Sequence, residues 1–215
     1  TSFSYRLEGD KAYITGYTGT LPDVVVPAVI DGYPVYAIEN LRSPILTHVV
    51  VSEGIEEIGE FAFMHYLNRD EEYYVNNLVS VSLPQSLKVI SDWGFSGQEN
   101  LQEITFGGVE QIGRGAFSGC SKLTQITLPD TLTTIEWKAF EYSGLTSLTI
   151  PVNVSFIRDT SFIENCSSLT TLRVAEGNPY YEMEDGILYQ TASKSVFYTM
   201  PNIEAVSYTH LRAHE

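Results

Sequence analysis

The chain has 215 residues, of which 43% are hydrophobic, 18% are charged and 12% are aromatic. This composition is typical of ordinary globular proteins and excludes disordered and collagen-like chains. The formal net charge of −15 argues against nucleic-acid binding, because an acidic surface repels a phosphate backbone. The apolar runs are only a few residues long, so we expect no membrane insertion in this segment.

The chain begins with residues 1–45, which we expect to form an amino-terminal entry cap and a first degenerate repeat. A self-similar unit then fills residues 46–175. The units open at Leu46, Leu78, Leu101, Leu123, Leu145 and Leu169. A unit of about 22 residues is too short to bury its own apolar face, so neighbouring units must stack as a solenoid. The alternative, a set of separate α/β subdomains, needs helical patterns of ten or more residues, which the sequence lacks.

The unit that starts at Leu123 illustrates the predicted local structure. Its Ile126 and Leu128 alternate with polar residues, which is the period of a strand with one buried face. Pro129 follows directly and ends the strand, because proline has no N–H to donate to a ladder. Phe140 belongs to a column of phenylalanines that predicts a buried spine, next to tight turns or short 3₁₀ segments. Each repeat is therefore predicted to contribute one short parallel β-strand.

An insertion, residues 65–77, interrupts the array with the sequence HYLNRDEEYYVNN. Insertions in solenoids become loops on one face. Tyr66, Tyr73 and Tyr74 offer large contact areas at low entropic cost, so they are candidate binding residues. The alternative is that these rings pack against the edge of the repeats.

Residues that alternate with the inward positions of each strand must point to solvent. They form two columns: His48, Val50, Ser80, Ser82, Glu103, Thr105, Gln125, Thr127, Ser147, Thr149, Thr171 and Arg173. One interpretation is a solubilising face made of strand-favouring residues. The other is a recognition face for protein or glycan, whose candidate residues are those from Glu103 onward.

The carboxy-terminal region, residues 176–206, contains alternating apolar residues and predicts a capping β-hairpin followed by the start of a further unit. The last nine residues, 207–215, have no repeat register and resemble translated adapter sequence. We expect this tail to be non-native, disordered and without function.

Cys120 and Cys166 occupy equivalent turn positions two units apart, which places them on the order of 10 Å apart in a stack. A disulfide needs Cα atoms within about 7 Å, so we predict two unpaired, buried packing residues; a bridge or metal pair is the alternative. The chain has four histidines and neither a nucleophile motif nor a phosphate-binding loop. We therefore predict no enzymatic activity, no cofactor and no metal. A paired-carboxylate hydrolase stays open as a less favoured alternative, since carboxylates are abundant.

The pattern LxxIxLPxxLxxIxxxAFxxC, carried by residues 101–120 and 145–166, closely resembles the BspA-like branch of the leucine-rich repeat proteins. The flanks agree: FSYRLEGDKAYITGYTGT from Phe3 is similar to the family's amino-terminal entry, and EGNPYYEMEDGILYQ from Glu176 to its break after an array. The resemblance covers residues 3–206 and implies a leucine-rich-repeat solenoid. The sequence departs from the pattern at Gly107-Gly108, which replace a proline-containing turn, and at the shortened turn 142–144.

The resemblance implies a protein that is secreted or displayed on the surface of bacteria of the mouth or gut, where such proteins are associated with adhesion. We therefore expect a non-enzymatic recognition module, extracellular or on the cell surface, whose partners are host or bacterial surface proteins or glycans. The alternative from another class is a structural spacer that displays other domains.

Overall fold

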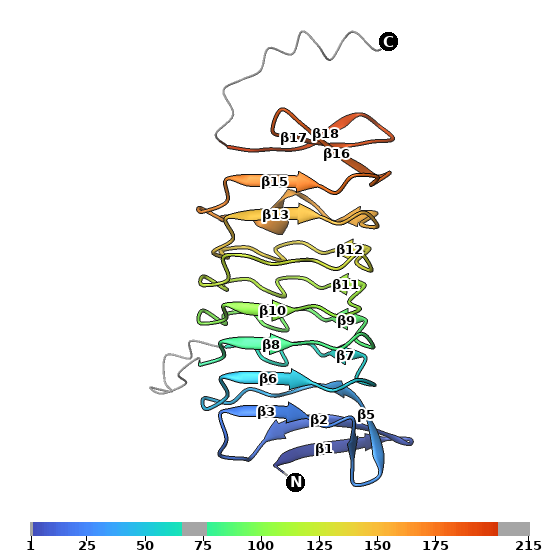
Figure 1. Ribbon diagram of the computed structural model, residues 1–215, viewed down its shortest axis with the longest axis vertical. Coiled ribbons are helices and arrows are strands. Elements are labelled where there is room, and N and C mark those ends of the chain that lie inside the picture. The colour runs from blue at the N-terminus through green and yellow to red at the C-terminus, as the bar shows by residue number, and fades with distance from the viewer. Residues whose placement is uncertain (1, 66–76, 202–215) are drawn as a thin grey trace.

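A computed structural model describes residues 2–65 and 77–201 of the chain. The chain winds into a β-solenoid whose coils stack along one axis, with β1 (Phe3–Glu8) and β18 (Ser195–Thr199) at opposite ends of the stack (Figure 1). One 3₁₀ segment, η1 (Thr160–Ile163), is the only helix among the described residues. None of these residues forms a helix long and apolar enough to cross a membrane. The predicted solenoid is therefore confirmed.

One side of the stack is formed by the strands that the Ile-x-Leu alternation predicts. A four-stranded parallel sheet contains β3 (Asp23–Val26), β6 (His48–Val51), β8 (Ser80–Ser82) and β10 (Glu103–Thr105). Further along the stack, β13 (Ser147–Ile150) pairs in parallel with β15 (Thr171–Val174). Equivalent residues of successive repeats are paired, as in Ile104 opposite Val81. This register places each inward apolar residue above its counterpart in the previous coil.

A second sheet, which the sequence did not predict, runs along another side of the stack, and its strands within the repeat array are all parallel. Its strands in the array are two residues long: β7 (Glu57–Ile58), β9 (Val89–Ile90), β11 (Gln111–Ile112), β12 (Thr134–Ile135) and β14 (Phe156–Ile157). Each of these strands ends in a buried isoleucine. A repeat therefore contributes up to two strands rather than one. Two residues are too few to show the alternation by which a strand is recognised in sequence.

The core is a continuous column of apolar side chains with an aromatic spine. The rings of Phe63, Phe95, Phe117 and Phe140 stack in sequence, with centroid distances of 4.8, 5.4 and 5.7 Å. All four are buried, as is Phe162 in η1. The predicted phenylalanine spine is thus confirmed, and it requires each ring to lie directly above the ring of the preceding coil.

Both ends of the described stack are covered by antiparallel strands. At the amino-terminal end, β1 (Phe3–Glu8) pairs with β2 (Lys11–Tyr17), and β4 (Val29–Ile30) pairs with β5 (Tyr33–Ile38). The other end carries a three-stranded antiparallel sheet of β16 (Tyr181–Glu184), β17 (Ile187–Gln190) and β18 (Ser195–Thr199). Because Tyr181 and Leu188 of this sheet are buried, it shields apolar side chains of the last coil from water. The expected tail, residues 207–215, lies outside the described residues.

Candidate functional site

The predicted outward columns lie on the solvent side of the stack formed by the four-stranded sheet, the coil segment 124–128 and the β13–β15 pair. We call this side the strand face. Every member of the two columns is exposed or half-exposed. Some of them bridge neighbouring coils: His48 Nδ1 lies 2.7 Å from Ser80 Oγ, and the Thr105 hydroxyl donates to Ser82 Oγ at 3.0 Å. The strand face is therefore a largely polar surface built from equivalent positions of successive repeats.

The strand face is interrupted at residues 124–128, where the alternation predicts a strand and the structure has none. In Figure 1 this column has no arrow between β10 and β13. Ile126 is only partly buried, although its equivalents Val81 and Leu148 are fully buried. Among the described residues, no backbone hydrogen bond joins residues 103–106 to residues 124–128. The ladder is therefore broken at this coil.

A groove of about 1160 Å³ occupies the break, and we call it the strand-face groove. It is lined by residues 102–107 of one coil and by residues from Ser121 to Pro129 of the next. Four predicted candidates, Glu103, Thr105, Gln125 and Thr127, lie together around it. The other predicted candidates on this face, Ser147, Thr149, Thr171 and Arg173, lie on β13 and β15 instead.

The predicted tyrosine loop is not covered by the described residues, since Tyr66, Tyr73 and Tyr74 fall within residues 66–76. Its two anchor points are described. The His65 amide donates to the Ser96 carbonyl oxygen at 2.9 Å, and the Asn77 side-chain amide donates to the Pro44 carbonyl oxygen at 2.6 Å. Both ends of the insertion are therefore fixed to neighbouring coils of the stack.

A second groove, of about 610 Å³, runs along the second sheet, and we call it the lateral groove. Its lining includes Ser91 and Gly113, which follow the inward isoleucine of their repeats. Gln111, Thr134, Arg114 and Trp137 also line it. The sequence patterns considered above did not predict this groove. One sequence signal could have indicated it: small residues, Gly59, Ser91 and Gly113, follow the inward isoleucine in three successive repeats and are flanked by larger residues.

Polar side chains of the lateral groove are held by contacts between coils. The Asp92 carboxylate accepts a hydrogen bond from the Arg114 backbone N–H at 2.8 Å, and its other oxygen lies 3.6 Å from Arg114 Nε. The Arg114 guanidinium carbon lies 5.0 Å from the centre of the Trp137 ring, which is a cation–π distance. Glu57 accepts a hydrogen bond from the Ser91 hydroxyl at 2.8 Å. These groups are oriented before any ligand arrives.

Two tryptophans from different coils meet at the edge of this groove because the coil between them carries a glycine. Trp93 and Trp137 make an edge-to-face contact with ring centroids 6.3 Å apart. Gly115 lies between them with a φ of +57°, and a Cβ there would fall 2.1 Å from the Trp93 ring. Only glycine fits both the left-handed backbone and the ring above it.

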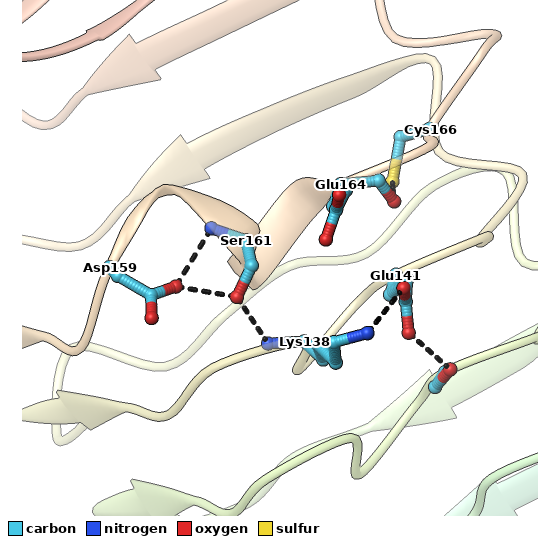
Figure 2. Close-up of polar contacts among 7 residues, drawn as sticks. Lys138, Glu141, Asp159, Ser161, Glu164 and Cys166 are labelled. Atoms are coloured by element: carbon cyan, nitrogen blue, oxygen red, sulfur yellow. Dashed lines mark hydrogen bonds and ion pairs between the residues drawn. The ribbon is translucent and has the colours of Figure 1, made fainter.

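A polar network links the turns of the two coils that follow (Figure 2). Lys138 Nζ lies 2.9 Å from Glu141 Oε1, and this hydrogen bond raises the pKa of the Lys138 ammonium. Asp159 accepts from the Ser161 backbone N–H at 2.8 Å and so caps η1, while the Lys138 backbone N–H donates to Ser161 Oγ at 3.2 Å. Each group is used to fix a turn. The network therefore contributes stability rather than a reactive group.

The sequence matches the BspA type Leucine rich repeat region, in six copies, over residues 36–170 and 107–210. The chain belongs to the BspA-type leucine-rich repeat family. No curated protein matches it. Among solved structures, a leucine-rich repeat protein of T. pallidum is 30% identical with a TM-score of 0.67, over 82% of this chain and 79% of the other.

Two further solved structures resemble this chain over most of its length. A leucine-rich cell surface protein from Faecalibacterium prausnitzii is 27% identical with a TM-score of 0.58, over 91% of this chain and 58% of that one. The pneumococcal vaccine antigen PcpA is 20% identical with a TM-score of 0.60, over 92% and 54%, and shows the fold alone. The BspA-type chain thus spans little more than half the length of these two proteins.

The break in the strand face coincides with the two departures from the BspA-type pattern. The turn at Gly107-Gly108 is one residue shorter than its equivalent at Pro84–Ser86. A Cβ on Gly107 would lie 2.1 Å from the Pro84 carbonyl oxygen, so this turn is drawn tightly onto the preceding coil. The coil from Leu123 keeps the proline-containing turn, and its strand segment does not pair with the coil before it. The shortened turn at residues 142–144 flanks it on the other side.

The two cysteines of the BspA-type repeats are unpaired, as predicted. Cys120 is buried and its thiol donates to the Phe95 carbonyl oxygen at 3.4 Å. Cys166, predicted to be buried, is partly exposed, and its thiol donates to the Phe140 carbonyl oxygen at 3.0 Å. Burial raises the pKa of both thiols, which keeps them protonated and weakly nucleophilic. In the described part of the chain, no group of three or more histidine, cysteine or carboxylate side chains is arranged to hold a metal ion.

Proposed function

We propose that this BspA-type chain is a non-enzymatic recognition or adhesion module that acts outside the cell or on its surface. Its ligand is a protein or a glycan of a host or bacterial surface, and its binding residues are those of the strand face and the tyrosine loop, residues 65–77. The family and the relatives described as surface proteins support this assignment. Repeat solenoids offer extended surfaces suited to such recognition.

The observation that carries this proposal is the strand-face groove. Glu103, Thr105, Gln125 and Thr127 line it, and all four side chains are exposed. Hollows of this kind exclude water from part of a ligand and raise the contact area above that of a flat sheet. A face that only kept the protein in solution would need no such hollow.

The test is a binding screen of the purified chain against arrays of extracellular-matrix proteins and glycans. We expect Thr127→Lys to weaken binding of the ligand found, because a long charged side chain would fill the groove. Ser155→Lys is the matched control, since Ser155 is also exposed but lies outside this groove. Deletion of residues 66–76 is expected to preserve the melting profile and to weaken binding. Absence of any ligand for a natively melting chain would favour the structural spacer instead.

A further inference from the structure

The lateral groove is a second hollow on the side of the molecule formed by the second sheet. We propose that it binds a neutral, linear oligosaccharide. This inference rests on the proposed recognition function, but it concerns a separate site and names the chemical class of the ligand. None of the residues that line the lateral groove lines the strand-face groove.

The shape of the lateral groove fits an elongated ligand. Its lining comes from five successive coils, from Glu57 in the first to Arg158 in the last. Adjacent parallel strands lie about 4.8 Å apart, so the lining extends along the stack rather than forming one round pocket. Its volume of about 610 Å³ lies within the range of small-molecule sites. A chain of sugar rings lying along the coils matches this shape.

The hydrogen-bonding groups of the groove suit sugar hydroxyls. Gln111 offers an exposed amide with both donors and an acceptor, and its side chain makes no hydrogen bond within the described part of the chain. Arg114 presents planar donors that Asp92 and Trp137 already hold in place. Glu57 offers carboxylate oxygens. A hydroxyl both donates and accepts, so neighbouring hydroxyls of one sugar satisfy carboxylate, guanidinium and amide groups together.

The charges of the groove favour a neutral ligand. Four carboxylates line it (Glu57, Glu60, Asp92 and Glu136) together with two guanidinium groups (Arg114 and Arg158). Four negative and two positive charges leave a local excess of two negative charges, and the whole chain carries −15. Polyanionic glycans are therefore repelled. Cationic peptides are attracted less strongly than four carboxylates alone would attract them, because both arginines repel such peptides and Asp92 already pairs with Arg114.

Calorimetric titration with cellohexaose, xylohexaose and mannohexaose tests the proposal, with hexagalacturonate as an acidic oligomer of equal length and a lysine-rich peptide as the competing class. We expect saturable binding of at least one neutral hexamer and none of hexagalacturonate. Two matched variants locate the site: Gln111→Ala lies in the lateral groove, and Gln125→Ala places the same change on another exposed glutamine, in the strand-face groove. Gln111→Ala should weaken hexamer binding about fivefold, the effect of one lost hydrogen bond, and Gln125→Ala should leave it unchanged.

A third variant, Arg114→Lys, keeps the charge and removes the planar donor pair, and is expected to weaken hexamer binding at least as much. Thermal melts of each variant show that the fold is retained. Binding of none of the three neutral hexamers, binding lost in Gln125→Ala rather than Gln111→Ala, or binding of the lysine-rich peptide alone would each overturn the inference. In all three cases a protein or glycan ligand sensitive to Thr127→Lys would still support the proposed function, so the two failures are distinguishable.

Discussion

At the scale of single residues, the aromatic spine concentrates stability in a few positions. Phe117 stacks between Phe95 and Phe140 and also makes an edge-to-face contact with Phe106. Phe117→Ala should lower the free energy of unfolding by about 3–5 kcal/mol, because a large cavity opens in a packed column. Phe156→Ala is the control: Phe156 lies on β14 with 41% of its surface exposed. Urea denaturation compares the two, and equal losses would show that the rings do not act as a spine.

Gly115, the glycine between the two tryptophans, allows two costs of a substitution to be measured separately: the strain of a left-handed backbone and the overlap of a new Cβ with the Trp93 ring. Gly115→Ala should cost more stability than Gly9→Ala, although both glycines have a φ near +60°. Nothing lies within 4 Å of a Cβ on Gly9, so Gly9→Ala measures the left-handed backbone alone, about 1–2 kcal/mol. The excess at Gly115 should disappear when Trp93→Ala is added. A double-mutant cycle of unfolding free energies measures this, and an excess that persists would contradict the overlap.

At the scale of elements, the sequence predicted the first strand of the repeats, wrongly only in the repeat from Leu123, and did not predict the second strand. An alternation such as that of buried Val49 and Val51 on β6 identifies a half-buried strand, because every second residue is apolar and inward over several residues. The pair Gln111–Ile112 contains only one inward residue and carries no period. The strand-face candidates followed from the first pattern. The lateral groove could not be predicted in this way, because its lining comes from several coils. The sequence of a single repeat does not show which side chains of the neighbouring coils lie beside Gly113.

The broken coil leads to a prediction at the same scale. Replacing Gly107-Gly108 by Pro-Asp-Thr restores the length and sequence of the turn at residues 129–131. We expect the coil from Leu123 to pair with β10 in this variant, because the turn would no longer be held against Pro84. Hydrogen exchange measures the pairing: the Thr127 amide should gain protection, while Leu172 on the remote β15 serves as the internal reference. Unchanged exchange at Thr127 would show that the shortened turn at residues 142–144 sets the break instead.

At the scale of the whole molecule, the stability of the stack is approximately the sum of the contacts between neighbouring coils. The net charge of −15 lowers this stability by repulsion between coils. Unscreened carboxylates on successive coils repel one another, and the Debye length falls from about 30 Å at 0.01 M salt to about 8 Å at 0.15 M. Added sodium chloride should therefore raise the melting temperature by a few degrees over this range. Ion pairs between coils, such as Lys88 with Glu110 at 3.0 Å, weaken under the same screening, but both side chains are exposed and contribute little. Differential scanning calorimetry at the two salt concentrations decides which of the two effects is larger, repulsion among carboxylates or attraction in ion pairs between coils. A fall in melting temperature with added salt would mean that the attraction dominates the electrostatics of the stack.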